Sequence, residues 1–318
     1  MAYETTVISE PICRKLRQTY APSMLFSAKA DIAGICVELL TEDRDHIDMW
    51  RDNFYAPSDM VRPHARIICV KDPKRPLSVD FNPETFTAFL YNFDYYGWVK
   101  SIALGISGYI LESAHDIYSI HGAAIDFDGV GVALIAPSKT GKTTQSWGLL
   151  RDANSRLITD DWFFVTFGQG RPSIRGSEKN CYIDADIGDV WDMYKPLVRF
   201  VKFDNKGRGI ANIRWVTGNT SVEVDASLRY IILLKRDYND ETISRKLTPD
   251  EALDYMLAHD LCNPHQIVRD EFRSSIRKEF FRKVFSECTT YLINTRGTPQ
   301  ETQNEIRRII GGEQDVRP

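Results

Sequence analysis

One stretch of this sequence constrains the fold more than any other, because it predicts a strand, a tight loop and a helix in direct succession. The apolar run Val130–Ile135 predicts a buried strand, and the run Thr143–Leu150 is compatible with a helix. The segment between them reads Ala136-Pro137-Ser138-Lys139-Thr140-Gly141-Lys142-Thr143. It matches the phosphate-binding loop pattern G-x-x-x-x-G-K-[ST], except that alanine replaces the first glycine. The alternative interpretation is a polar turn before an ordinary helix.

The chemistry of such a loop is electrostatic. Successive backbone N–H groups converge on one point, and the helix N-terminus adds its partial positive charge, so a triphosphate fits there. Lys142 would neutralise the outer phosphates and the Thr143 hydroxyl would hold Mg²⁺. We therefore expect ATP and Mg²⁺ as cofactors, with the nucleotide held by Ala136, Pro137, Ser138, Lys139, Thr140, Gly141, Lys142, Thr143 and Thr144.

Two carboxylates follow the next predicted strand. The run Arg156–Thr159 leads directly into Asp160 and Asp161. Phosphoryl transfer uses one carboxylate near the metal and another to accept the proton of the attacking hydroxyl. Adjacent side chains on an extended backbone point in different directions, so the pair is suited to two roles. The alternative is a solvated acidic turn.

A histidine precedes the strand that carries the loop. His121 and Gly122 stand before Ala123–Phe127, which predicts a strand, and Asp128-Gly129 predicts a hairpin turn to the next strand. Histidine serves as a general acid or base near neutral pH, so His121 is a candidate active-site residue. The alternative is a histidine with a structural role only.

These motifs, in this order, resemble those of HPr kinase/phosphorylase. The resemblance is carried by Ser119–Ile125, Gly131–Thr143 and Ser155–Asp161, and it covers about Ser119 to Val165. That family belongs with the phosphoenolpyruvate carboxykinases in one class of P-loop kinases. The resemblance implies an α/β fold: a P-loop kinase core of this type, with a mixed sheet flanked by helices, plus a smaller N-terminal α+β region.

The resemblance also implies roles for individual residues. It makes His121 a contact of the transferred phosphate, Lys142 the phosphate lysine and Thr143 a magnesium ligand. It makes Asp160 and Asp161 the base and its metal-side neighbour, without deciding which is which. Asp161 is counted with Thr143 among the expected metal ligands.

Two departures from the family pattern narrow the expected activity. The family has a metal-binding glutamate before Arg-Gly, whereas Ile174 precedes Arg175-Gly176 here. Glu178 is the candidate to supply the missing metal carboxylate from a shifted position. We also find no match to the proline-arginine loop that the family needs for phosphorylase activity, so we expect a kinase with its own substrate.

Cations downstream of the loop could contact an anionic substrate or the transferring group. Arg236 ends the predicted strand Leu228–Leu234 and is a candidate to stabilise charge in the transition state, as is Arg175. Further cations stand in a polar, glycine-containing stretch that predicts a mobile flap: Arg199, Lys202, Lys206, Arg208 and Arg214. The alternative is an ordinary solvated loop.

Composition excludes several classes of partner. The net charge of −4 over 318 residues provides no field to recruit nucleic acid or an acidic membrane. No apolar run approaches the length of a membrane-spanning helix, and Met1–Glu10 lacks the pattern of a signal peptide. The six cysteines form no C-x-x-C pair and are expected to be reduced thiols. We therefore expect a cytoplasmic protein.

The chain divides, by pattern, into two expected domains. Residues 1–82 are strand-rich, with strands expected at Gly34–Leu40 and Ala65–Val70, and their role is unassigned. Residues 83–318 form the expected catalytic domain. Its other expected elements are a helical segment over Pro83–His115, strands at Trp162–Val165 and Thr290–Asn294, and helices at Glu271–Glu287 and Thr298–Ile310.

The leading hypothesis is an ATP-dependent kinase that transfers the γ-phosphoryl of ATP·Mg²⁺ to a hydroxyl of a small metabolite or a protein serine. Two alternatives remain: a bifunctional serine kinase/phosphorylase of the HPr type, and a nucleotide-binding regulatory module without catalysis. The paired aspartates favour an enzyme, because a pure binding site needs only one metal carboxylate. Related kinases form homo-oligomers, but no feature of the sequence indicates a number.

Overall fold

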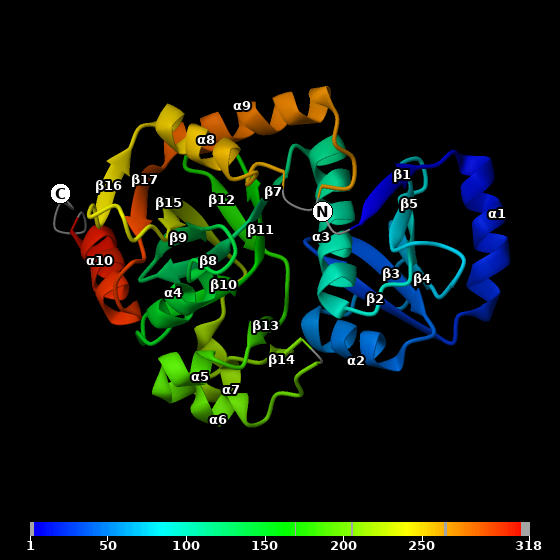
Figure 1. Cartoon of the computed structure of the whole chain (residues 1–318), viewed down its shortest axis with the longest axis horizontal. Helices are drawn as coiled ribbons and strands as arrows, with labels where there is room; N and C mark the ends of the chain where they lie inside the picture. Colours follow the sequence, from blue (N-terminus) through cyan, green and yellow to red (C-terminus); the bar gives the residue numbers. More distant parts are fainter. Residues whose placement is uncertain (1–2, 169, 205, 264–265, 313–318) are drawn as a thin grey trace. The chain divides into compact units, whose positions relative to one another are not determined.

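The computed structural model describes residues 3–168, 170–204, 206–263 and 266–312. The outermost residues of the two expected domains, 1–2 and 313–318, lie outside the described residues. The chain forms two compact units, shown in Figure 1. The first comprises Met1–Ile117 with two short returning segments, Ser177–Lys179 and His265–Arg273. The second holds the remainder.

The first unit is built on a six-stranded sheet. Its strand order is β1-β5-β6-β4-β3-β2, with parallel and antiparallel pairs. The strands are β1 (Glu4–Val7), β2 (Phe26–Ile32), β3 (Ile35–Thr41), β4 (Ala65–Val70), β5 (Ser78–Asn82) and β6 (Thr87–Tyr91). The helical elements are α1 (Glu10–Tyr20), η1 (Ala21–Ser23), α2 (Arg44–Asn53) and α3 (Tyr96–His115).

The expected helical segment over Pro83–His115 is wrong in its first part. Residues Thr87–Tyr91 form β6, and the helix begins only at Tyr96. All five residues of β6 are buried between β4 and β5, and a short, fully buried run does not reveal by periodicity whether it is strand or helix. The first unit continues to Ile117, so the division falls after α3 and not at residue 82.

The second unit contains a nine-stranded mixed sheet. The order along its main path is β10-β8-β9-β15-β12-β11-β7, and β17 and β16 extend it from β15. The strands are β7 (Tyr118–His121), β8 (Ala123–Phe127), β9 (Val130–Ile135), β10 (Ser155–Thr159), β11 (Trp162–Thr166), β12 (Ser173–Gly176), β15 (Asp225–Lys235), β16 (Ser244–Leu247) and β17 (Thr289–Asn294). The strand that leads into the loop, β9, runs antiparallel to β8 and parallel to β15.

Alternate residues of the central strands face two separate apolar layers. Ile232 and Leu234 lie in one layer and Ile231 and Leu233 in the other, as the twofold period of a strand requires. The first layer packs α4 (Lys142–Leu149) and α10 (Pro299–Gly311) against the sheet, and the second packs α8 (Pro249–Ala258) and α9 (Glu271–Glu287). The structure is therefore mixed α/β, with helices on both faces of this sheet.

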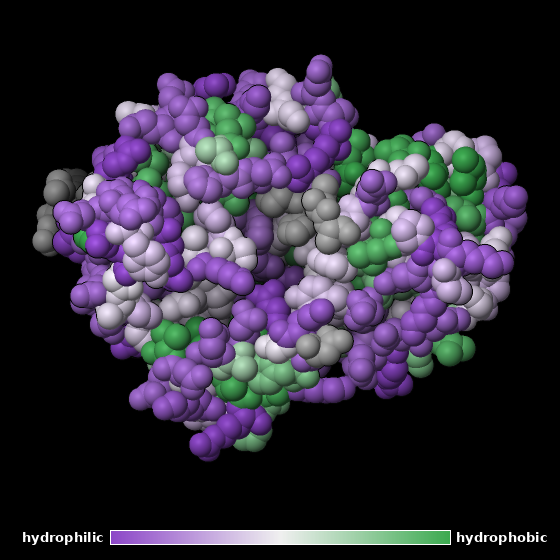
Figure 2. All heavy atoms as spheres, viewed as in Figure 1, coloured by the Kyte–Doolittle hydropathy of each residue, from purple (hydrophilic) through white to green (hydrophobic). Residues whose placement is uncertain are grey.

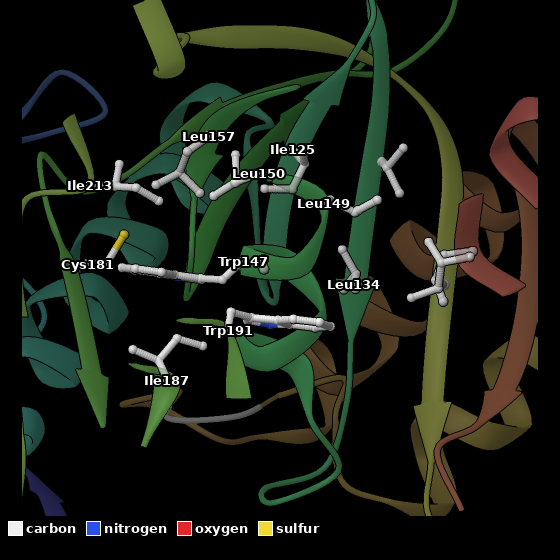
Figure 3. Packing of buried hydrophobic residues seen from close by; sticks show 14 of the residues in the cluster. Ile125, Leu134, Trp147, Leu149, Leu150, Leu157, Cys181, Ile187, Trp191 and Ile213 are labelled. Atoms are coloured by element: carbon white, nitrogen blue, oxygen red, sulfur yellow. The ribbon is translucent and has the colours of Figure 1, made fainter. Parts of the chain in front are cut away.

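A small lobe is attached to the α4 side of the second unit. It contains the hairpin β13 (Cys181–Asp184) with β14 (Arg208–Ala211) and the short helices α5 (Ile187–Val190), η2 (Asp192–Tyr194), α6 (Lys195–Val198), α7 (Arg214–Thr217) and η3 (Asn219–Ser221). Figure 3 shows Ile187 and Trp191 of the lobe in the same apolar layer as Trp147 of α4 and Leu134 of β9.

All six cysteines are free thiols, and only Cys288 is not fully buried. Burial raises the pKa of Cys69 to about 12, so this thiol stays protonated at neutral pH. Over the described ranges, no helix combines the length and the apolar character needed to cross a bilayer.

Candidate functional site

The loop between β9 and α4 has the geometry of a tight turn at a helix start. Lys139 and Gly141 adopt positive φ angles of 66° and 98°, and the Thr140 hydroxyl donates to the Pro137 carbonyl at 2.7 Å. Gly141 supplies a backbone conformation that other residues avoid. Ala136 is not among the described residues with positive φ, and its methyl group is buried in the apolar layer. Alanine is therefore accommodated where the motif has glycine.

The N-terminus of α4 has no side-chain cap. Gly141 is the N-cap residue, and no side chain accepts a hydrogen bond from the first turn. Helix starts leave backbone N–H groups without intrahelical partners, and these groups favour an anion. The loop and the eight-residue helix α4 are thus a suitable receptor for phosphate.

Three charged or polar side chains meet beside this loop. Lys142 Nζ lies 2.9 Å from Asp161 Oδ1 and donates to the Asp160 carbonyl oxygen at 2.7 Å. His121 Nε2 lies 3.0 Å from the same Asp161 oxygen. The side chain of Asp161 is 25% exposed, so the carboxylate is reachable from solvent. The arrangement brings together residues from β7, α4 and the end of β10.

Asp160 has a different environment from its neighbour. It is only 4% exposed, and its Oδ1 accepts a hydrogen bond from the Ser146 hydroxyl at 2.8 Å. Ser146 lies on α4 three residues after Thr143, on the same side of the helix. The carboxylate of Asp160 therefore faces α4, whereas that of Asp161 faces His121 and Lys142.

A close backbone approach holds His121 at this position. Gly122 N donates to the Asp161 carbonyl oxygen at 2.8 Å, and His121 pairs across the strands with Trp162. The imidazole and indole rings are stacked at 5.7 Å between centroids. A Cβ atom on Gly122 would lie 2.8 Å from the Leu134 carbonyl oxygen, so a larger residue would push the strands apart.

Arg236, at the end of β15, lies beside the loop. Its Nη2 is 3.5 Å from the position that a Cβ on Gly141 would occupy. Its Nε donates to the Thr295 hydroxyl at 3.2 Å, and that hydroxyl lies 2.9 Å from the Thr140 carbonyl oxygen. Thr295 thus joins Arg236 to the loop. The neighbouring Lys235 hydrogen-bonds to Asp240 and lowers the pKa of that carboxyl group to about 2.

Glu178, the expected third metal ligand, belongs to the first unit. Its carboxylate contacts Lys100 Nζ at 3.0 Å and Asn53 Nδ2 at 2.9 Å, and the side chains of Glu178 and Lys100 are 4% and 2% exposed. Tyr96 donates to Asn53 Oδ1, and burial raises the pKa of Tyr96 well above its usual value. Glu178 is therefore part of a buried network around α3, and its charge is already compensated there.

The expected flap is folded into the small lobe. Arg208 Nε bonds to Asp184 at 3.1 Å, and its guanidinium lies over the Tyr182 ring. Arg214 donates to Asn180 at 3.3 Å. The others of this group, Arg199, Lys202 and Lys206, are exposed. Arg175 lies in β12, across from Phe164 and Asp225 in the neighbouring strands.

Four residues of this site were not predicted from the sequence: Ser146, Trp162, Thr295 and Arg277. Arg277 is buried and donates to the Ser119 carbonyl of β7 at 2.6 Å. Trp162 could have been found from its place next to Asp161. No sequence motif around Thr295 indicates that it contacts the loop, because Thr295 follows β17 and lies far from the loop along the chain.

A metal would have few carboxylates to bind here. Within the described part of the chain, no group of three or more His, Cys, Asp and Glu side chains is arranged to hold a metal ion. Magnesium at nucleotide sites is typically bound by one or two carboxylates together with water and substrate phosphates. Thr143 and the two aspartates fit that requirement.

Comparisons with known proteins give a distant fold-level similarity. No protein-family model matches the chain, and no curated protein matches its sequence. Among solved structures, the HPr(Ser) kinase/phosphatase from Coxiella burnetii is similar over 62% of this chain and 98% of that chain, with 13% identity and a TM-score of 0.36.

Proposed function

We propose that this protein is an ATP·Mg²⁺-dependent kinase that transfers the γ-phosphoryl group to a hydroxyl of its acceptor. The observation that carries the proposal is the contact of Lys142 with Asp161 and of Asp161 with His121, beside an uncapped helix start. A lysine, an accessible carboxylate and an anion-binding helix end are the components that phosphoryl transfer needs. A structural turn would not require a lysine, a carboxylate and a histidine to converge.

Asp161 is proposed as the general base. Its carboxylate is reachable from solvent, whereas that of Asp160 is buried against α4. Bound ATP·Mg²⁺ supplies the phosphoryl group. Lys142 exchanges its contact with Asp161 for the phosphates, and Asp161 then accepts the proton of the acceptor hydroxyl. The acceptor oxygen bonds to the γ-phosphorus as the bond to the β–γ bridging oxygen breaks, and ADP leaves.

Thr143 and Asp160 are proposed to hold the magnesium ion. Thr143 is in the first turn of α4, and Ser146, one turn later, fixes the Asp160 carboxylate against the same helix. This assignment gives Asp160 the metal-side role that was expected of Asp161. Glu178 is left out of the metal site, because Lys100 already neutralises it.

Three groups are proposed to stabilise charge on the transferring phosphoryl group. Lys142 ends the loop at the start of α4, Arg236 lies beside the loop, and His121 shares the Asp161 oxygen with Lys142. Cations and hydrogen-bond donors that are already in place when charge develops account for much of the catalysis in such sites. Lys142, Arg236 and His121 are therefore proposed to stabilise the charge on the phosphoryl group without a large rearrangement of the backbone.

The test replaces Lys142 by alanine. We expect nucleotide-dependent phosphorylation, measured with labelled ATP and a panel of metabolites and proteins as acceptors, to fall about 10²-fold or more. Lys278→Ala is the matched control, since Lys278 is an exposed lysine of α9, outside the loop. It should retain at least half of the activity.

Retained turnover in the Lys142→Ala protein, with an unchanged melting temperature, would contradict the assignment of the phosphate lysine. Binding of a fluorescent ATP analogue without transfer to any acceptor would instead favour the regulatory module. Release of phosphate from a phosphoserine protein would favour the bifunctional kinase/phosphorylase.

A further inference from the structure

The strand that carries His121 lies at one end of its sheet. β7 is the last strand along the main path, and among the strands that the structure describes it pairs with β11 alone. It is also short, with the four residues Tyr118–His121. A strand with one neighbour presents unpaired backbone N–H and C=O groups on its open side. The position of His121 in the proposed site therefore depends on what holds that open side.

The register of β7 shows which backbone groups face the open side. Gly122 N donates to the Asp161 carbonyl oxygen at 2.8 Å, so the Gly122 N–H faces β11. Backbone groups of successive residues along an antiparallel strand point to opposite sides, so those of His121 and Ser119 face away from β11. Because Ser119 is buried, its carbonyl oxygen needs a partner within the protein.

Arg277 of α9 is that partner. Its Nη2 donates to the Ser119 carbonyl oxygen at 2.6 Å, and its Nε donates to the Cys262 carbonyl oxygen at 2.9 Å. Arg277 is only 3% exposed, and its guanidinium lies 5.3 Å and 5.2 Å from the ring centroids of Phe280 and Phe281. The guanidinium therefore joins β7 to the segment that follows α8 at one buried point.

Apolar packing alone does not account for an arginine at this position. Other charged residues of α9, such as Lys278 and Glu279, are exposed, and Figure 2 shows mainly hydrophilic side chains along the top of the view, where α9 lies in Figure 1. The helix packs on the sheet through apolar side chains such as those of Phe281 and Val284. Burying a charged group is costly unless it is hydrogen-bonded, so the two carbonyl contacts are the feature that distinguishes Arg277.

We propose that Arg277 is a positioning residue for His121. Its bond to the Ser119 carbonyl fixes β7 two residues before His121, whose Nε2 lies 3.0 Å from the Asp161 oxygen that Lys142 also contacts. A displacement of β7 would move the imidazole away from Asp161 and from the transferring group. The effect on turnover rests on the proposed kinase function, whereas the placement of His121 is measurable without it.

The competing explanation is that Arg277 stabilises the fold and has no effect on the site. β7 has a second contact with α9, because the Tyr118 ring stacks on the Phe280 ring at 4.5 Å between centroids. Stacked rings can slide past each other, whereas two hydrogen bonds from one planar guanidinium set both distance and direction. We therefore expect loss of the guanidinium to disturb His121 more than loss of helix packing does.

The experiment replaces Arg277 by lysine in the full-length protein without nucleotide. Lysine keeps the positive charge but presents one ammonium group in place of the planar guanidinium, so it cannot hold both carbonyl oxygens in the same geometry. The readout is the imidazole signal of His121 in a ¹H–¹³C NMR spectrum of protein labelled at histidine. Its loss in His121→Gln identifies this signal among those of the six histidines. We expect the signal to shift or broaden in Arg277→Lys.

Val284→Ala is the matched control, because it removes buried packing about two turns further along α9 and leaves Arg277 in place. It should lower the melting temperature and leave the His121 signal where the unaltered protein has it. Arg277→Gln is the second variant if Arg277→Lys does not fold, since its neutral amide leaves no buried cation, and it should shift the signal too. An unchanged signal in the folded Arg277 variants, or an equal shift in Val284→Ala, would overturn the proposal.

Turnover of labelled ATP with the panel of acceptors gives a separate readout. In Arg277→Lys it should fall about tenfold, while affinity for a fluorescent ATP analogue stays within about twofold, because the phosphate loop is unaltered. If the His121 signal moves but the unaltered protein transfers no phosphate, the positioning role stands and the kinase function falls. If the unaltered protein transfers phosphate through Lys142 but the signal and turnover of Arg277→Lys are unchanged, the reverse holds.

Discussion

At the scale of single residues, the two adjacent aspartates are separated by what surrounds them. Asp161 contacts His121 and Lys142 through one carboxylate oxygen, and Asp160 accepts from Ser146 within the protein. The two residues form the bend between β10 and β11, where the backbone directs the Asp160 carboxylate to Ser146 and the Asp161 carboxylate to His121 and Lys142. The two adjacent aspartates therefore have different chemical environments, although they are neighbours in the sequence.

Conservative changes at the two aspartates should have different effects. Asp161→Asn is expected to lower turnover by about 10²–10⁴-fold, because the amide cannot accept the proton. Asp160→Asn is expected to raise the magnesium concentration needed for half-maximal activity by about tenfold, because it weakens the metal-side carboxylate. Magnesium titrations of turnover and of nucleotide affinity distinguish the two. Identical behaviour of the two variants would show that the assigned roles are not separate.

Thr295 offers a second residue-scale test. Its hydroxyl links Arg236 to the Thr140 carbonyl and also lies 3.1 Å from the Lys235 carbonyl oxygen, so Thr295→Val removes all of these hydrogen bonds with little change in shape. We expect affinity for a fluorescent ATP analogue to fall about tenfold, which corresponds to about 1.4 kcal/mol. Thr295→Ser keeps the hydroxyl and should keep the affinity. If Thr295→Ser lost as much affinity for the ATP analogue as Thr295→Val, the loss would result from packing and not from the hydrogen bonds.

At the scale of elements, the site depends on how closely the ends of strands approach. The junction of β7 and β8 lies against β9, and Gly122 N binds the Asp161 carbonyl at the start of β11. A strand–loop–helix pattern is readable from local sequence, but the position of His121 depends on this contact between segments. Packing at the junction of β7 and β8 therefore requires a glycine at position 122, directly after His121.

Gly122→Ala should therefore affect both stability and activity. The added methyl group would meet the Leu134 carbonyl oxygen at 2.8 Å, and backbone cannot move aside as a flexible side chain would. We expect a loss of about 1–3 kcal/mol in the free energy of unfolding, measured by denaturant titration. Gly168→Ala is the control, since nothing lies within 4 Å of its added Cβ. Equal stability of both variants would contradict this account.

At the scale of the whole molecule, contacts between distant parts of the sequence decide which charges remain for chemistry. Glu178 follows the strand β12 in sequence, yet it lies in the first unit and pairs with Lys100 of α3. Spacing along the chain made Glu178 a metal candidate, whereas folding gave it a buried cationic partner. Buried charges persist in proteins when they are paired and hydrogen-bonded.

Lys100→Met should strongly destabilise the protein. It removes one side of the buried Lys100–Glu178 ion pair, and breaking a buried pair typically costs about 3–5 kcal/mol. The double variant Lys100→Met with Glu178→Met removes both charges and should recover much of the loss. Thermal and denaturant unfolding measure both. A double variant as unstable as the single one would show that the uncompensated charge is not the cause.

The sequence by itself determined the short-range features of this protein. The strands β8 and β9, the loop, α4 and the start of α10 lie where the patterns indicate, and Thr298 and Glu301 form a capping box at the start of α10. These features depend on residues a few positions apart, so local periodicity and capping chemistry reveal them. His121, Lys142 and the aspartates were candidates for the site because they lie at the ends of those elements.

Only the tertiary structure decided how the side chains are partnered. It separated Asp160 from Asp161, brought Arg236 and Thr295 to the loop, placed Glu178 with Lys100 and exposed Phe200 and Trp215 on the lobe. Each of these outcomes depends on packing between segments that are distant in the chain. A local sequence pattern does not indicate which distant segments will contact each other. The strand, loop and helix of the proposed phosphate site were therefore visible in the sequence, but the partners that give the loop a proposed chemistry were not.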